Sequence, residues 1–361
     1  MNILYMSCHS VLEYLEVKLF TEAGHNVISL GAYLNNNKGT DLRGEIAGLY
    51  QNQHLQSIAM SCSKENIHPE LLEWADVVVM MHNSRVDVVD HPQPWLGSTH
   101  RNSNDMTGNN WEKFNKAGKP VIWRSIGQSN KQIEEALQPF RNDGLKIVRY
   151  SPKEKNIPSY CGEDAMIRFP SDPDEFNGYV GSAPRIVNVS QAMFGNGTVK
   201  GRGDHMAKDV FDRVVDGFDW KIFGPDNDLA NEHNGGLLSY GDLKTMLSLN
   251  RVYFYCGTRP ASYTLGFQEA LMSGIPVVSI GPDNGNKIYN QKTFEAHELI
   301  GVNGEAGYWS DDIDLLREYC GNLLQNQAVA QEVGAKGRLR AIELFGKDMI
   351  KESWRKFFET L

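Results

Sequence analysis

Glu269 lies one helical turn inside residues 265–272, whose composition predicts a short helix that follows the polar loop 259–262. Ser273 and Gly274 end this predicted helix, because glycine suits the left-handed position after a helix C-terminus. The N–H groups of a helix N-terminus have no partner within the helix and lie at the positive end of its dipole, which favours a phosphate. A carboxylate one turn further along can accept hydrogen bonds from ribose hydroxyls. The segment therefore predicts a nucleoside diphosphate site, whereas an isolated helical glutamate would simply be solvated.

The residues around Glu269 match a known pattern. Residues 275–280, Ile-Pro-Val-Val-Ser-Ile, are apolar and β-branched, as expected of a strand buried on both faces. Residues 269–278 resemble the second half of the donor-binding signature of the retaining glycosyltransferases of family four, which have the GT-B fold. The family pattern is a Glu, seven residues, a second Glu, then Ala, a few residues and Gly-x-Pro-Val-Val. Glu269 matches the second Glu, and the position of the first falls on Ala261.

The resemblance implies a nucleotide-sugar donor as co-substrate, a UDP-sugar first among the candidates, with no further cofactor. In the family the first acid of the pattern contacts the transferred sugar. Ala261 therefore leaves the identity of the sugar undefined, while the nucleotide end of the pattern is intact.

Bulk composition is that of a soluble globular protein. The chain has 361 residues, of which 41% are hydrophobic and 22% charged, and this length suits two domains. It contains no apolar run of transmembrane length and no N-terminal signal pattern. Its five cysteines are widely scattered, which favours reduced thiols in a cytoplasm over a disulfide frame or a zinc site. The net charge of −9 does not favour a nucleic-acid partner, although a local basic surface can exist on an acidic protein.

Strands alternate with helices in both halves of the sequence, which predicts an α/β fold of two Rossmann-like, doubly wound domains. Residues 170–179 contain two prolines, several acids and a glycine, so they predict an interdomain linker. We expect an N-terminal domain at residues 1–172 and a nucleotide-sugar-binding domain at 173–346. The GT-B resemblance implies that the domains face each other across a cleft and that residues 347–361 return to the first. Residues 57–61 weakly favour a strand.

The resemblance also implies where the phosphate ligands lie. Relatives carry an Arg and a Lys in the loop after the first strand of the second domain, where this chain has Lys200 and Arg202. These side chains can neutralise a diphosphate, with Arg suited to bidentate contacts. Arg259 is a third candidate, and the amides near Thr264 and Leu265 complete the expected phosphate site. Each of these charged residues could otherwise be a solvated loop residue.

Two further segments of the second domain are candidates for the nucleotide. Gly224 ends the predicted strand 220–223 at its carboxyl end, where α/β sheets bind ligands, although a plain turn explains it equally well. Ser239 and Tyr240 begin a predicted helix that in relatives lies beside the base, and core packing explains them nearly as well.

The acceptor is expected at the first domain. His9 and Ser10 lie in the turn after the first predicted strand, and His82 directly follows strand 75–81. Arg124 belongs to residues 123–128, where relatives have a polar loop at the cleft. In relatives a His at the end of the third strand contacts the transferred sugar, so His82, with Lys200 and Arg202, is expected to act in catalysis. A lone His is otherwise more often a structural group.

The resemblance implies retaining transfer without a metal. The β-phosphate leaving group takes the acceptor proton on the face from which it departs, and the protein positions the substrates and stabilises the growing charge. No acidic pair with metal-ligand spacing occurs in the sequence.

Three alternatives remain open. The acceptor could be a hydroxymethylated pyrimidine in DNA, because loop 84–110 combines His, Arg and Asn with a Trp. The protein could be a nucleotide-sugar epimerase of similar fold, or a non-catalytic nucleotide-sugar binder, since the first acid of the pattern is missing. A dinucleotide-dependent oxidoreductase is disfavoured, because no Gly-x-Gly-x-x-Gly follows the first strand.

Overall fold

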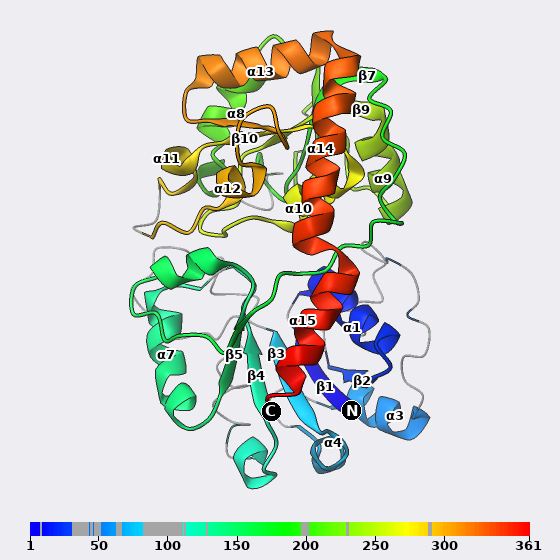
Figure 1. The fold of residues 1–361 in the computed structure, drawn as a ribbon, viewed down its shortest axis with the longest axis vertical. Coiled ribbons are helices and arrows are strands. Elements are labelled where there is room, and N and C mark those ends of the chain that lie inside the picture. The colour runs from blue at the N-terminus through cyan, green and yellow to red at the C-terminus, as the bar shows by residue number, and fades with distance from the viewer. Residues whose placement is uncertain are drawn as a thin grey trace. The chain divides into compact units, whose positions relative to one another are not determined.

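The structure, a computed structural model, describes the chain except residues 8, 31–42, 44–45, 47–51, 63–66, 82–110, 112, 128, 196–200, 202, 229–230 and 288–290, and except the side chains of Ser10 and Asp204. The described residues form two compact units, each built on one parallel sheet with helices (Figure 1). Unit 1 comprises Met1–Pro170 and Asp348–Leu361, and unit 2 comprises Ser171–Lys347. The predicted α/β fold with two doubly wound sheets is confirmed.

The sheet of unit 1 has the strand order β2-β1-β3-β4-β5-β6. Its strands are β1 (Asn2–Ser7), β2 (Asn26–Ser29), β3 (Val77–Met81), β4 (Val121–Arg124), β5 (Lys146–Arg149) and β6 (Ala165–Met166). Its helices are α1 (Ser10–Glu22), α3 (Gln53–Ser61), α4 (Pro69–Trp74), α7 (Lys131–Asn142), the 3-10 helix η1 (Pro152–Asn156) and α15 (Lys347–Phe358). All five residues of β3 are buried, as expected of a central parallel strand. The chain moves outward in opposite directions from β1 and β3, so the switch point of this sheet lies between their carboxyl ends.

The weak strand preference of residues 57–61 is wrong, because this segment belongs to α3. Asn52 caps the helix by accepting a hydrogen bond from the Leu55 N–H at 3.1 Å. Leu55 and Ala59, one turn apart, both face the core. Capping and helical spacing thus outweigh the short apolar run.

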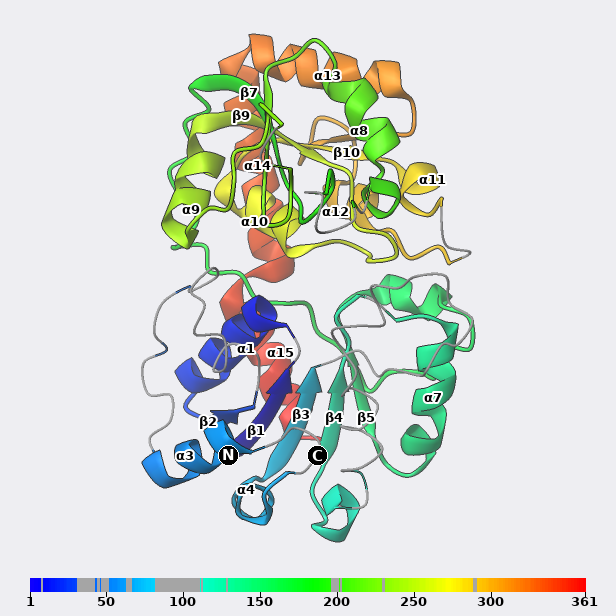
Figure 2. The same cartoon turned by 180° about the vertical axis from the view of Figure 1, so that it is seen from behind.

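Helix α15 completes the core of unit 1 although it is the last helix of the sequence. The two views show it lying beside α1 (Figures 1 and 2). The ring of Phe20 on α1 lies 5.1 Å from that of Trp354 and 5.5 Å from that of Phe358. Trp354 is fully enclosed, so α15 covers a core face of this unit.

The sheet of unit 2 has the strand order β11-β10-β9-β7-β8. Its strands are β7 (Ala183–Val189), β8 (Trp220–Phe223), β9 (Asn250–Tyr255), β10 (Val277–Ile280) and β11 (Tyr308–Ser310). Its helices are η2 (Gly203–Met206), α8 (Lys208–Val215), α9 (Tyr240–Leu249), α10 (Leu265–Ser273), α11 (Pro282–Gly285), α12 (Ala296–Ile300), α13 (Ile313–Gln325) and α14 (Gln327–Phe345). The switch point here lies between β7 and β9, because β8 and β10 extend the sheet in opposite directions.

Helix α10 occupies the position that the sequence predicts. It ends at Gly274, whose φ of 83° is left-handed, and Ile275 and Pro276 lead into the fully buried strand β10. Along its length α10 packs against α14, so seven of its nine residues are buried.

Candidate functional site

The first turn of α10 reaches the surface of unit 2. Thr264, Leu265 and Gly266 are all partly exposed, in contrast to the rest of the helix. Thr264 stands at the N-cap with an extended backbone, but its side chain makes no capping hydrogen bond within the described residues. The amides of Leu265 and Gly266 are therefore not occupied by a side-chain cap and can meet a ligand, whereas the backbone of Thr264 contacts the Tyr255 hydroxyl.

Gly266 fixes where this helix N-terminus lies. A Cβ at residue 266 would sit 2.9 Å from Tyr253 Oη and 3.7 Å from the carbonyl oxygen of Val189. Tyr253 belongs to β9 and Val189 is the last residue of β7, so the helix begins where these two strands meet. This is the switch point of the sheet, which is the usual ligand site of doubly wound folds.

Glu269 lies one turn after Leu265, on the same side of α10. Glu269 is only 4% exposed and its Oε1 is inaccessible to solvent, so the ribose contact expected from the sequence stays a prediction. Burial raises the pKa of Tyr253 far above its usual range, and the charges of Tyr255 and Glu269 add to the rise. The Tyr253 hydroxyl is therefore a neutral group next to the Glu269 carboxylate.

Arg259 ties the loop before α10 to its surroundings. Its Nε donates to the carbonyl oxygen of Asn284 on α11 at 2.7 Å, and its Nη2 donates to the same oxygen. Its backbone N–H donates to the carbonyl oxygen of His205 on η2 at 2.8 Å. Arg259 is 3% exposed, so the structure gives it a scaffold role; the phosphate contact expected from the sequence stays a prediction.

The predicted phosphate ligands Lys200 and Arg202 lie outside the described residues. Gly201, which lies between them in the sequence, packs against Phe194, because a Cβ at residue 201 would lie 3.1 Å from the Phe194 backbone. The contact between His205 and Arg259 brings the far end of this loop beside the loop before α10. The loops after β7 and after β9 therefore meet at one edge of the sheet.

Gly224 also lies at this edge. It follows β8, and a Cβ there would come within 2.5 Å of the carbonyl oxygen of Ser190, just after β7. Asn227 holds the same strand ends together, because its Nδ2 donates to Ser190 O at 2.8 Å. Gly224 thus meets a packing requirement, and a contact with nucleotide stays a prediction.

Ser239 and Tyr240 serve the start of α9. Ser239 Oγ accepts a hydrogen bond from the Asp242 N–H at 3.2 Å and so caps the helix. Tyr240 Oη donates to Glu175 at 2.5 Å, and Lys244 Nζ lies 4.5 Å from the centre of the tyrosine ring. These contacts explain both residues structurally, and their predicted place beside the base is left as a prediction.

On unit 1, His9 follows the carboxyl end of β1 and is exposed. Its Nδ1 accepts a hydrogen bond from the Leu12 N–H at 3.3 Å, so the imidazole caps α1. The side chain of Ser10 and all of His82 lie outside the described residues.

Arg124 lies in the interior of unit 1. Its Nε donates to Glu16 Oε1 on α1 at 2.9 Å, and its guanidinium carbon lies 4.1 Å from the centre of the Phe169 ring. Glu16 also accepts a hydrogen bond from Tyr5 Oη at 2.7 Å. Burial raises the pKa of Glu16, and the Arg124 charge opposes the rise. Because Arg124 is 0% exposed, we assign its charge to the fold and leave it out of the proposed site.

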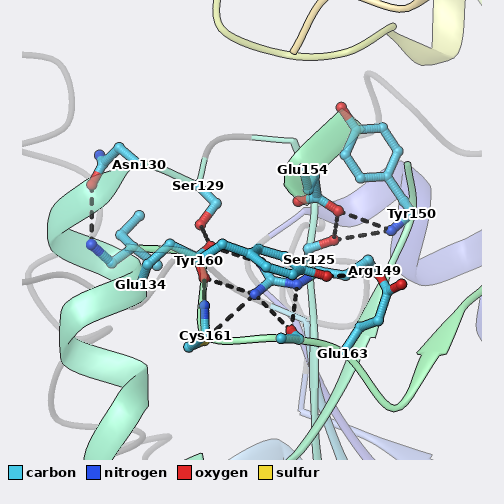
Figure 3. Close-up of polar contacts among 12 residues, drawn as sticks. Ser125, Ser129, Asn130, Glu134, Arg149, Tyr150, Glu154, Tyr160, Cys161 and Glu163 are labelled. Carbon is cyan, nitrogen blue, oxygen red and sulfur yellow. Dashed lines mark hydrogen bonds and ion pairs between the residues drawn. The ribbon is translucent and has the colours of Figure 1, made fainter. Parts of the chain in front are cut away.

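Sequence reasoning missed a second network of buried charges in unit 1 (Figure 3). Arg149, at the end of β5, forms a bidentate pair with Glu134 of α7, with both N–O distances 2.7 Å. The N–H and Sγ of Cys161 and the hydroxyl of Ser129 also donate to Glu134. Arginine within an apolar strand and glutamate on the apolar face of a helix are the only local signals of this pair.

Glu154 of η1 lies next to this network (Figure 3). Its Oε2 accepts from Ser125 Oγ at 2.7 Å and from the Tyr150 N–H at 3.1 Å. Burial raises the pKa of Glu154 to about 7, against the opposing charge of Arg149. Glu134 already neutralises Arg149, so Glu154 is a second carboxyl group near one cation. Glu154 therefore loses its proton at a higher pH than an ordinary carboxyl group.

Two other properties bear on function. Within the described residues, no group of three or more His, Cys, Asp or Glu is arranged to hold a metal ion. None of the described helices has the length and apolar character needed to cross a bilayer.

Comparison with known proteins gives structural relatives only. No model of a protein family matches the sequence, and no curated protein sequence matches it. The fold is similar to that of Anabaena Alr3699/HepE crystallised with UDP and glucose, with 10% identity, a TM-score of 0.63 and 100% of both chains covered. It is similar to sucrose-phosphate synthase from Thermosynechococcus elongatus, with 11% identity, a TM-score of 0.65, and 100% of this chain and 98% of that one covered.

A third similar structure is an alpha-glucosyltransferase in complex with UDP-glucose and DNA containing an abasic site. It has 11% identity and a TM-score of 0.62, with 99% of each chain covered. At such low identity these likenesses concern the fold. The chain has the GT-B fold of glycosyltransferases, as the resemblance of residues 269–278 implies.

Proposed function

We propose that the protein is a glycosyltransferase that moves a sugar from a nucleoside-diphosphate sugar to a hydroxyl acceptor, with retention and without a metal ion. The observation that carries this proposal is the open first turn of α10 at the β7/β9 switch point, with a carboxylate one turn further along the helix. UDP is the first candidate nucleotide, because the similar HepE structure contains UDP.

The donor contacts follow from the geometry of α10. The amides near Thr264 and Leu265 point out of the helix N-terminus, where the dipole favours a diphosphate. Glu269, one turn along, accepts hydrogen bonds from the ribose hydroxyls. The absence of a side chain at Gly266 lets the helix lie close to the strand ends. The phosphate and ribose contacts therefore lie at the same edge of the sheet.

Charge stabilisation on the leaving diphosphate is assigned to Lys200 and Arg202, and contact with the transferred sugar to His82. The β-phosphate takes the acceptor proton as the glycosidic bond breaks, so the protein's part is positioning and electrostatic stabilisation. We assign the acceptor to unit 1, at the carboxyl ends of β1 and β3, through His9 and Ser10. The buried cysteines Cys161, Cys256 and Cys320 form no disulfide within the described residues, which supports a cytoplasmic location.

Calorimetric titration with UDP tests the donor site. Glu269→Gln should weaken UDP binding by about 1–3 kcal/mol, the range for a lost hydrogen bond to a charged group. Glu318→Gln, an exposed change on α13, is the matched control and should leave affinity unchanged. Equal affinity of the wild type and Glu269→Gln would remove the ribose contact. Transfer of radiolabelled sugar in the presence of a chelator then tests the absence of a metal requirement.

A second candidate is transfer to 5-hydroxymethylpyrimidines in DNA. The observation that favours it is the similarity, over 99% of the chain, to a glucosyltransferase crystallised with DNA. The net charge of −9 argues against it. Transfer to DNA should fall steeply with rising salt, whereas transfer to a small acceptor should not. Absence of transfer to hydroxymethylated DNA at low salt, with the donor bound, excludes this candidate.

A further inference from the structure

Leu339 is the most exposed large apolar side chain of α14. It is 63% exposed, whereas Val333, Gly337 and Ala341 of the same helix are buried. Figure 1 shows α14 along the outside of unit 2. The helix therefore turns one face to the core of this unit and one face to solvent, and Leu339 lies on the second. A single exposed leucine is ordinary on a protein surface, so the neighbouring residues determine whether it marks an interface.

A groove of about 460 Å³ borders Leu339. It lies between α14 and residues 300–306, which include the end of α12 and the turn after it. Ile300 and Ala306, both almost fully buried, contribute the apolar part of its lining together with Leu339. Val302, within the same turn, is 66% exposed. Two large apolar side chains thus stand exposed at or next to a partly apolar groove, as at protein–protein interfaces.

The charged side chains that line the groove are balanced in sign. Lys336 and Arg340 contribute two positive charges, and Glu305 and Glu343 contribute two negative charges. A surface without net charge does not attract a polyanion such as nucleic acid. It instead favours a partner whose own charges alternate in the matching order.

The order of these charges along α14 is complementary to itself. Lys336 and Glu343 are seven residues, or about two turns, apart on one side of the helix, and Leu339 lies between them. When two copies of α14 pack antiparallel about a twofold axis beside Leu339, Lys336 of each copy lies opposite Glu343 of the partner subunit. The symmetry forms this pair twice, and Leu339 meets its own copy near the axis. A second copy of this chain therefore matches both the charge pattern and the apolar centre.

The ion pairs that these side chains form within one chain are compatible with such a contact. Lys336 Nζ lies 2.7 Å from Glu332 Oε1, and Arg340 Nη1 lies 3.3 Å from Glu343 Oε2. All four side chains are exposed, and pairs of this kind contribute little to stability. A partner can therefore take over these charges at little cost, or join them in a larger network.

We propose that the outer face of α14 and its groove form the twofold interface of a homodimer. Leu339 packs at the centre of this interface, and Lys336 pairs with Glu343 of the partner subunit. The proposal concerns assembly, so it does not depend on the donor site or on the proposed activity.

Sedimentation velocity of the full chain over a concentration series tests the charge pairing. Wild type should sediment as a dimer. Lys336→Glu makes both members of each pair acidic, and Glu343→Lys makes both basic, so each variant alone should dimerise about tenfold more weakly or worse. An equal mixture of the two variants should restore the dimer, because each then meets charges of opposite sign. The double variant Lys336→Glu/Glu343→Lys should also dimerise, since it exchanges both signs at once.

The same measurement on Leu339→Asp tests the apolar centre. A carboxylate beside its own copy at the axis should abolish the dimer. Leu315→Asp is the matched control, because Leu315 lies on α13, is 42% exposed and is not part of the groove. Its variant should dimerise as wild type does.

Three results would overturn the proposal. A wild type that sediments as a monomer at every concentration would exclude the homodimer and leave the groove to a different partner. A dimer that persists in Leu339→Asp would place the interface elsewhere. A mixture of the two charge variants that stays monomeric would contradict the antiparallel pairing.

Thermal melting of each variant separates assembly from folding. The substituted side chains are exposed, so each variant should remain folded. If Leu339→Asp does not fold, Leu339→Ala removes the same contact without adding a charge and must weaken the dimer in its place. The mixture of charge variants decides the pairing independently of either change.

Discussion

The two units share the same winding of their first five strands but treat the carboxyl edges of their sheets differently. In unit 1 the charges at this edge are paired internally, as Arg124 with Glu16 and Arg149 with Glu134. In unit 2 the same edge presents the partly exposed first turn of α10 beside the strand ends. Topology therefore determines where a ligand can bind, and the pairing of charges assigns the ends of β4 and β5 in unit 1 to the scaffold.

The difference also explains how each unit is stabilised. A buried ion pair constrains its partners only if both charges remain, because removal of one leaves an uncompensated charge in the interior. The edge of unit 2 depends instead on close packing, as where the Gly266 backbone approaches the Tyr253 side chain. The following changes test this contrast.

The largest effect is expected from Arg149→Met. Loss of the guanidinium leaves Glu134 buried and unpaired, which should lower the free energy of unfolding by about 3–5 kcal/mol. Arg185→Met is the control, because Arg185 pairs with Asp219 at the surface and should change stability by less than about 1 kcal/mol. Urea unfolding measures both, and similar small effects would contradict the scaffold role of the unit 1 network.

Glu154 should make stability depend on pH. Its pKa of about 7 in the folded state exceeds its usual value of 4.5, so the folded protein holds this proton more tightly than the unfolded chain. The resulting stabilisation is complete below about pH 4.5 and is lost as the pH rises through about 7, amounting to about 3 kcal/mol.

Chemical unfolding of Glu154→Gln across this pH range should therefore show a smaller decrease than wild type. Glu163→Gln, at an exposed carboxylate that accepts a hydrogen bond from Tyr160, should retain the wild-type slope. Identical slopes in wild type and Glu154→Gln would show that another group titrates.

Gly266→Ala should disturb the edge of unit 2. The added methyl group would lie 2.9 Å from Tyr253 Oη, so the helix start must shift, at a cost of about 1–2 kcal/mol in stability. Tyr253→Phe removes the opposing oxygen, and the double variant should recover most of the loss in thermal melting. A double variant that melts at the same temperature as Gly266→Ala would show that the added methyl group clashes with an atom other than Tyr253 Oη.

The smallest of these effects on folding is expected from Glu269→Gln. Because glutamine keeps the size of the side chain and one accepting oxygen, the melting temperature of the variant should remain close to that of wild type while UDP affinity falls by about 1–3 kcal/mol. A large loss of stability with unchanged UDP affinity would assign Glu269 to the scaffold and erase the contrast between the two edges.

Local sequence signals were enough to predict the central strands, the doubly wound class of both sheets and the end of α10 at Gly274, but not the edge strands β6 and β11. They could not reveal the burial of Arg124, because its partner Glu16 is 108 positions away in the chain. Arg124 was expected to contact a ligand because the resembled family has a polar loop at the cleft in this position. The groove beside Leu339 likewise depends on how α12 packs, which no spacing in the sequence encodes. Helix α3 was missed because its cap, Asn52, lies outside the apolar run.

The placement of α15 has a consequence for synthesis on the ribosome. Unit 1 needs residues 348–361, which emerge only after residues 171–347 of unit 2 have been translated. Until then the nascent first unit has no Trp354 or Phe358 to cover Phe20. Unit 2 is continuous in sequence and can fold as it leaves the exit tunnel, so the N-terminal unit is the one that finishes last, in reverse of the usual vectorial order.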